Sequence, residues 1–170
     1  MYLFAQILGF AGIAVAALSF QRKTTKGILF MQIISCLVFF MHFLLLGAYT
    51  GAVLNILSCL RSVVFYYKNK AWASSKAWIL VFIVLYIVST ILAGEGRTGL
   101  FPMLGCCIQT VGYYIDDAQK ARKVLWISSP LWMVYNYINM SIGGLVAETL
   151  NLASVFIALF RYRNKKEQEV

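Results

Sequence analysis

The sequence predicts an all-α membrane protein with several spanning helices, and three observations support this fold class. Of the 170 residues, 61% are hydrophobic and only 12% are charged, with a mean hydropathy of +0.77. Long apolar stretches follow one another in series, separated by short polar breaks, as transmembrane helices do. Lysine and arginine are concentrated in every second break, which is typical of a chain that crosses a bilayer repeatedly.

Seven apolar stretches define the expected helices. They are Tyr2–Phe20, Gly27–Leu46, Gly51–Tyr67, Ala77–Leu92, Leu100–Ile115, Val124–Met140 and Leu145–Phe160. Several hold only 16 or 17 residues, near the lower end of the roughly 17–25 needed to cross the hydrocarbon core. The breaks are short, so neighbouring helices are expected to be antiparallel within a single membrane domain that covers residues 1–170.

Charged clusters, turns and prolines near the ends of these stretches support their interpretation as separate helices. The first has a basic cluster after it and none before it, so we interpret it as a retained span rather than a cleaved signal. The second follows the polar segment QRKTTK, the uncharged turns GAYT and MSIG precede the third and seventh, and the fourth contains no charge. Pro102 opens the fifth, where its missing N–H is harmless, and Pro130 inside the sixth is expected to kink it.

The distribution of basic residues predicts the orientation. Thirteen of the fifteen follow the first, third, fifth or seventh helix: Arg22, Lys23, Lys26, Lys68, Lys70, Lys76, Lys120, Arg122, Lys123, Arg161, Arg163, Lys165 and Lys166. The opposite breaks contain only Arg97, and Arg61 lies inside the third helix. Under the positive-inside rule the N-terminus is outside and the C-terminus is cytoplasmic. Topology thereby accounts for the net charge of +9, and no nucleic acid is expected as a partner.

The third and seventh helices carry similar polar patterns, 93 positions apart. Each begins at a glycine, Gly51 or Gly144, that we expect to close the preceding turn. Three polar residues then follow at spacings of three, namely Asn55, Ser58 and Arg61 in one helix and Glu148, Asn151 and Ser154 in the other. This repetition predicts two three-helix units in parallel orientation, residues 1–67 and 100–160, joined by a linking helix at 77–92.

Polar residues inside these helices form the candidate site, because intramembrane polar groups usually face a protein interior or a water-filled cavity. The candidate substrate-binding residues are His42, Asn55, Ser58, Arg61, Asn136, Glu148 and Asn151. Arg61 could bind a carboxylate or phosphate, or extend to the cytoplasmic headgroups. Glu148 could bind substrate or a proton, or stabilise a helix N-terminus. His42 could relay a proton near Glu148 or be satisfied by one neighbour, and the amides and hydroxyl could simply join helices.

The sequence contains no motif expected of an enzyme, a metal site or a cofactor site. A single histidine excludes a multi-histidine metal site, and there is no Ser–His–Asp set and no glycine-rich phosphate loop after a strand. Cys36, Cys59, Cys106 and Cys107 fall in apolar stretches without metal-ligand spacing, and we interpret them as small buried hydrophobic residues. No catalytic activity, metal or cofactor is therefore expected.

Two segments resemble a known family. HFLLLGAYTGAVLNILSCLR (His42–Arg61), preceded by SFQRKTTKG, resembles the bacterial inner membrane proteins of the YgjV type, and SIGGLVAE (Ser141–Glu148) with the helix up to Arg161 is similar to that family's C-terminal signature. The likeness runs from about Leu3 to Arg163. Positions matching the family are His42, Gly47, Tyr49, Arg61, Asn136, Ser141, Gly143, Gly144, Glu148 and Arg161. Tyr135 stands where relatives often have a second histidine.

The same family looks distantly related to the SWEET and PQ-loop transporters, which are also built from three-helix units. This chain departs from them because it has no Pro-Gln dipeptide and no proline in its first unit. The resemblance and the polar pattern together predict a carrier or facilitator of a small polar metabolite in the bacterial inner membrane, working by alternating access between the two units. The competing hypothesis is a receptor or structural protein that moves no solute. Expected partners are the lipid bilayer and the metabolite, and assembly into a homo-oligomer is left open.

Overall fold

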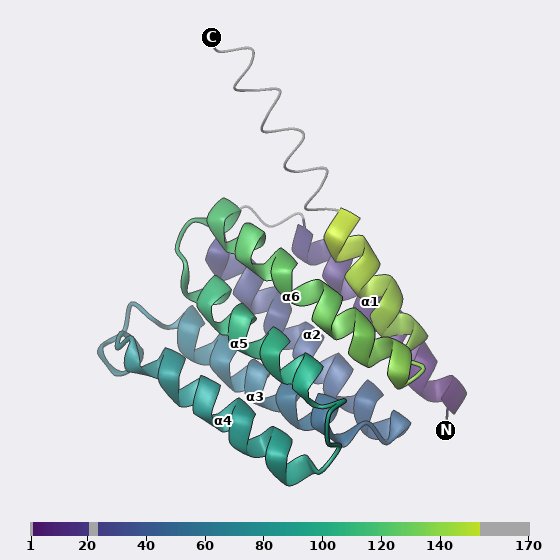
Figure 1. The fold of residues 1–170 in the computed structure, drawn as a ribbon. Helices are drawn as coiled ribbons and strands as arrows, with labels where there is room; N and C mark the ends of the chain where they lie inside the picture. Colours follow the sequence, from purple (N-terminus) through teal and green to yellow (C-terminus); the bar gives the residue numbers. More distant parts are fainter. Residues whose placement is uncertain (1, 21–23, 154–170) are drawn as a thin grey trace.

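The computed structural model describes residues 2–20 and 24–153, and every regular element within these ranges is a helix (Figure 1). The elements are α1 (Tyr2–Phe20), α2 (Thr25–Leu46), α3 (Tyr49–Tyr66), the 3-10 helix η1 (Ala71–Ala73), α4 (Ala77–Ala93), α5 (Leu100–Tyr114), α6 (Ala118–Ile138) and a final described helix, Ile142–Ala153. The range of α1 matches its prediction, and the ends of α2 to α5 agree within two residues. The all-α prediction is confirmed.

Two predicted helix starts need correction. Helix α6 begins at Ala118 instead of Val124, because Asp117 caps it: the backbone N–H of Lys120 donates to Oδ1 of Asp117 over 3.0 Å. The basic residues assigned to the preceding loop therefore lie in the first turns of α6. The last helix begins at Ile142 instead of Leu145. Its predicted end at Phe160, together with Ser154, Arg161, Arg163, Lys165 and Lys166, lies outside the described residues, as do Arg22 and Lys23.

The turn before α3 is made by Gly47 and not by Gly51. Gly47 ends α2 with a φ of 74°, in the left-handed region that glycine adopts without strain. Gly51 lies within the first turn of α3, where an added Cβ would be 2.7 Å from Cε1 of Tyr135. Its missing side chain therefore permits close packing of α3 against α6.

The turn before the last helix is also made by a residue with a positive φ. Met140 has a φ of 51° and reverses the chain, and the new helix begins two residues later. Gly144 lies inside the first turn of that helix, where an added Cβ would collide with the side-chain amide of Asn136. Gly51 and Gly144 therefore both permit close packing of helices. The prediction that they close the preceding turns is wrong.

The helices form a bundle in which α2 lies between α1 and α3, while α5 and α6 make a second closely packed pair (Figure 1). Helix α4 packs against α3 and α5 at the edge of the bundle. An aromatic cluster joins α2 to α6, with the ring of Phe43 5.7 Å from that of Tyr135 and 6.0 Å from that of Trp132. The cluster holds together helices from the two predicted units.

Two described helices, α2 and α3, are long and apolar enough to cross a membrane, with mean hydropathies of 2.4 and 1.2. Tyr2–Val15, Ala77–Ala93 and Ile142–Ala153 are shorter apolar helices. In α4, only Phe82, Tyr86 and Thr90 are buried, at intervals of four residues along one stripe. The rest of α4 is apolar and largely exposed, and an exposed apolar face of this size is unusual on a protein surrounded by water.

Candidate functional site

A cavity lies among α2, α3, α5, α6 and the last described helix. The volume of the cavity is about 140 Å³, which is enough for several waters or a small solute. Aromatic and aliphatic side chains form part of its wall. The polar side chains that line it are Gln32, Ser35, Asn55, Ser58, Gln109, Tyr113, Arg122, Ser128, Asn136, Glu148 and Asn151. Such a mixture of apolar walls and convergent polar groups is characteristic of small-molecule sites.

Five of the seven candidate site residues line this cavity. Asn55 and Ser58 come from α3, Asn136 comes from α6, and Glu148 and Asn151 come from the last helix. The fold therefore brings the two side chains of α3 together with three side chains that lie 78 to 96 positions further along the sequence. Asn55 and Glu148, and likewise Ser58 and Asn151, occupy equivalent places in the repeated pattern, and both pairs face the same cavity. Arg61 and His42 are not part of the lining.

Glu148 presents an incompletely bonded carboxyl group to the cavity. The side chains of Ser129 and Asn151 lie beside it, and Nδ2 of Asn151 donates to Oγ of Ser129 over 2.8 Å. Its Oε2 is buried and has no hydrogen-bond partner among the described residues. Because the helix begins at Ile142, Glu148 lies beyond the first turn, where interaction with the helix N-terminus is weak. A buried acceptor without a partner is what a ligand or an ordered water would satisfy.

The neutral polar residues differ in whether their hydrogen-bonding groups have partners. Nδ2 of Asn55 donates to the backbone oxygen of Gly51 over 2.8 Å, and the Ser58 hydroxyl is 3.1 Å from that of Tyr86. Oδ1 of Asn136 is buried and has no hydrogen-bond partner within the described part of the chain. Asn136 and Glu148 therefore each contribute an unpaired acceptor to one cavity.

Arg61 is fully buried behind the cavity wall. Its guanidinium carbon is 4.9 Å from the ring centre of Tyr113 and 5.9 Å from that of Tyr86. Nη1 donates to the backbone oxygen of Cys106 over 3.4 Å and to Oγ1 of Thr110 over 3.3 Å. Nε and Nη2 have no hydrogen-bond partner, and no carboxylate in the described ranges pairs with this charge. With none of its surface exposed, the side chain does not extend to a headgroup layer.

His42 lies away from the cavity, in a fully bonded structural cluster. Its Nδ1 is 2.7 Å from the carbonyl oxygen of Ala5, which can only accept, so Nδ1 carries the proton. Nε2 then accepts from the Ser141 hydroxyl over 2.7 Å, and that hydroxyl oxygen accepts from the N–H of Gly144 over 3.2 Å. The ring thereby joins α1, α2 and the turn before the last helix.

A hydrogen-bond network that the sequence did not predict lies at one end of the bundle. Glu95, in the loop between α4 and α5, accepts from the N–H of Thr50 over 2.9 Å and from the Tyr135 hydroxyl over 3.0 Å. The Tyr135 hydroxyl oxygen accepts in turn from the N–H of Gly51 over 2.8 Å. This Glu95 network connects the start of α3 to α6. Its one sequence signal is that Glu95 is the single carboxylate of the GAYT, AGEGRTG and MSIG breaks.

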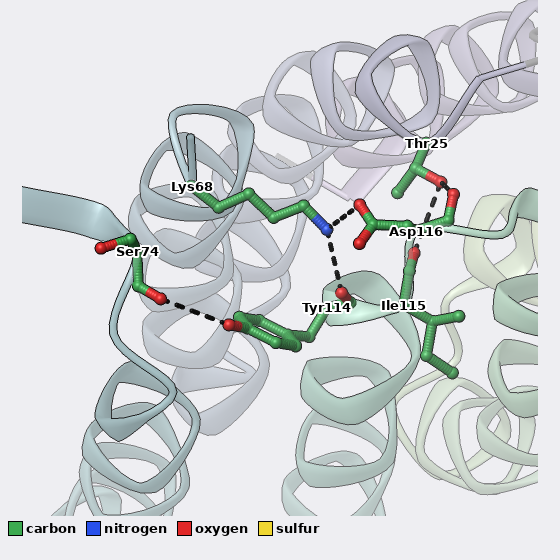
Figure 2. A network of polar contacts seen from close by, with 6 residues as sticks. All are labelled: Thr25, Lys68, Ser74, Tyr114, Ile115 and Asp116. Atoms are coloured by element: carbon green, nitrogen blue, oxygen red, sulfur yellow. Dashed lines mark hydrogen bonds and ion pairs between the residues drawn. The ribbon is translucent and has the colours of Figure 1, made fainter. Parts of the chain in front are cut away.

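A second network closes the opposite end, where several of the basic residues lie. Figure 2 shows Lys68 paired with the carboxylate of Asp116 and donating to the backbone oxygen of Tyr114 over 3.0 Å. Thr25, at the start of α2, donates to the backbone oxygen of Asp116 over 2.7 Å, and the Tyr114 hydroxyl donates to the backbone oxygen of Ser74 over 3.4 Å. This Lys68 network joins the start of α2, the ends of α3 and α5, and the loop that contains η1.

Comparisons with known proteins agree with the membrane character of the chain. The model of a family described as Bacterial inner membrane protein (Imp-YgjV) matches residues 3–166. The chain is similar to Inner membrane protein YgjV of Escherichia coli (strain K12), with 24% identity over 147 residues, which is 86% of this chain and 78% of that protein. No solved structure matches it. Since the family model covers nearly the whole sequence, the chain belongs to the Imp-YgjV family of bacterial inner membrane proteins.

Proposed function

We propose that this protein is a carrier or facilitator that moves a small polar metabolite across the inner membrane by alternating access between two three-helix units. The observation that carries the proposal is the cavity, because its lining comes from the repeated arms of both units. Asn55 and Ser58 belong to residues 1–67, while Asn136, Glu148 and Asn151 belong to residues 100–160. Small-molecule sites between structural repeats are a common design among secondary transporters.

The proposal includes seven spans in a three-plus-one-plus-three order, with the N-terminus outside. The two polar networks support this arrangement. The Lys68 network gathers the ends of α3 and α5 and the start of α2, while the Glu95 network gathers the start of α3, the loop after α4 and the end part of α6. These are the groupings that successive antiparallel spans require. The edge position of α4, in contact with α3 and α5, suits a linking helix.

Flux through the purified protein in liposomes tests the proposal. A thermal-shift panel of small polar metabolites first identifies solutes that stabilise the protein, and their uptake is then measured with radiolabel. Glu148→Gln keeps the side-chain shape and is expected to reduce uptake about tenfold, the equivalent of one charge-assisted hydrogen bond. Arg97→Gln, in the loop opposite the Lys68 network and outside the cavity, is the control and leaves uptake unchanged.

The alternative is a receptor or structural protein that binds or packs without moving solute. The two networks favour it in one respect, since both ends of the bundle are closed in a single structure. A solute that stabilises the wild-type protein, fails to stabilise Glu148→Gln and never crosses the liposome membrane would establish the receptor role. Equal uptake by wild-type protein and Glu148→Gln would contradict the proposed carrier site.

A further inference from the structure

The buried charge of Arg61 indicates the chemical class of the ligand. Arg61 is completely buried in a membrane protein, and none of the described carboxylates pairs with it. Removing a guanidinium from water without a counterion is expensive, and such a charge is seldom kept for stability alone. Arg61 already has two weak acceptors at 3.3 and 3.4 Å, neither of which carries a charge. The missing component of this environment is an anion.

The unused part of the guanidinium has the geometry for an oxyanion. Both hydrogen bonds that Arg61 makes to described residues use Nη1, and Nε and Nη2 have no hydrogen-bond partner among these residues. These two nitrogens share one edge of the planar group and donate in parallel, which matches two oxygens of a carboxylate or a phosphate. The side chain thus keeps its bidentate edge free while its other end is fixed.

The cavity lies close to Arg61. Ser58, one helical turn before Arg61 on α3, lines the cavity, and so does Tyr113, whose ring lies against the guanidinium. Tyr113 donates to Oε1 of Gln32 over 2.8 Å, a residue that also lines the cavity. Arg61 itself is not part of the lining, and the Tyr113 ring, which contacts its guanidinium, belongs to the cavity wall.

We infer that the cavity takes a small metabolite bearing an oxyanion, and that a shift of Tyr113 lets this group bind the Nε–Nη2 edge of Arg61. The inference rests on the proposed function, since it names the substrate class of the same cavity. The carboxyl group of Glu148 lies in the same cavity with an unpaired oxygen, so the rest of the metabolite presents a hydrogen-bond donor to it. A hydroxylated carboxylate and a hydroxylated phosphate ester both have this pattern.

Matched charged and neutral solutes test the inference on the full-length protein in detergent. The probes are lactate with lactamide, and glycerol 1-phosphate with glycerol, with thermal stabilisation measured over a concentration series. Wild-type protein is expected to be stabilised by one or both anions and by neither neutral partner. The anion that works identifies the group as a carboxylate or a phosphate. Equal shifts within each pair, or no shift with any probe, would overturn the inference.

Two substitutions at Arg61 separate binding from folding. Arg61→Met removes the charge, and it is expected to fold because the backbone oxygen of Cys106 still accepts from the Thr110 hydroxyl over 2.8 Å. The anion shift disappears in this variant. Arg61→Lys keeps the charge without the paired edge, and its apparent affinity falls about tenfold, the equivalent of one charge-assisted hydrogen bond. Arg97→Met makes the same change at an exposed arginine and keeps the full shift.

The outcomes distinguish this inference from the carrier proposal. An anion that stabilises the protein through Arg61 but shows no flux in liposomes supports the ligand class and contradicts transport. A neutral solute that crosses in a Glu148-dependent manner, with no anion shift, supports transport and overturns the ligand class. Should Arg61→Met fail to fold, unchanged anion affinity in Arg61→Lys would still contradict the bidentate contact.

Discussion

At the scale of single residues, His42 and Arg61 present opposite cases of a buried polar side chain. Both ring nitrogens of His42 are bonded over 2.7 Å, and the groups they contact are themselves satisfied. Arg61 has two donor nitrogens without a hydrogen-bond partner in the part of the chain that the structure describes. A fully bonded polar group rigidifies a structure, whereas a partly bonded one is costly and needs a functional explanation. The contacts therefore assign His42 to the scaffold, although sequence position made it as strong a site candidate as Arg61.

Replacing His42 by Ala tests that assignment. The change leaves the Ala5 carbonyl without its partner and opens a gap where α1, α2 and the Ser141 turn meet. Unfolding in detergent is expected to become easier by about 1–3 kcal/mol, the usual effect of orphaning a buried polar group. His42→Gln, which retains a donor of similar reach, should recover part of the loss. A His42→Ala protein with wild-type stability and no ligand binding would show that the residue belongs to the site.

At the scale of helices, the two polar networks join helix ends at opposite ends of the bundle. The Glu95 network connects α3, α6 and the α4–α5 loop, and the Lys68 network connects α2, α3 and α5 at the opposite end. The Glu95 network consists of hydrogen bonds, and the Lys68 network combines hydrogen bonds with the ion pair between Lys68 and Asp116. Alternating access in the proposed carrier requires these networks to break in turn.

Tyr135→Phe is expected to favour opening at the Glu95 end. The change removes the hydroxyl that bonds both Gly51 and Glu95, and the loss of about 1–2 kcal/mol corresponds to a roughly 5–30-fold shift between open and closed states. The readout is maleimide labelling of Ser35→Cys, a cavity-lining position, in a protein with the four native cysteines replaced. Labelling from the outer face should accelerate with Tyr135→Phe.

Lys68→Met provides the opposite arm of the same experiment. It breaks the ion pair with Asp116 and the bond to Tyr114, so labelling of Ser35→Cys from the cytoplasmic face should accelerate instead. Tyr137→Phe, an exposed tyrosine on the same helix as Tyr135, serves as the matched control and changes neither rate. If both network variants altered labelling from the same side, the two networks would not close opposite ends of one pathway.

At the scale of the whole molecule, the sequence predicts what depends on composition and fails where distant groups meet. Helix positions followed from hydropathy, whereas the start of α6 was missed because Asp117 caps a turn rich in basic residues. Asn55 and Ser58, whose spacing placed them on neighbouring faces of one helix, both line the cavity, whereas lining residues such as Ser35 and Ser128 were not among the candidates. Arg61 follows Asn55 by six residues, so the two side chains point about 120° apart around the helix. Arg61 therefore lies behind the cavity wall. The hydrogen bond between His42 and Ser141 joins residues 99 positions apart, so the sequence around either residue could not predict it.

The orientation of the whole chain is the property on which the direction of transport depends, and it can be tested separately from transport. Basic residues after the odd-numbered predicted helices predict that the Lys68 network lies at the cytoplasmic face, because translocating lysine and arginine across the membrane is unfavourable. This orientation predicts that the Glu95 network faces the periplasm. Single cysteines at Arg97 and at Lys70, both exposed, report on the two ends in intact cells. We expect Arg97→Cys to react with a membrane-impermeant maleimide before lysis and Lys70→Cys to react only after it. The reverse pattern would place the N-terminus inside, and labelling of both before lysis would mean that the two networks do not lie on opposite faces.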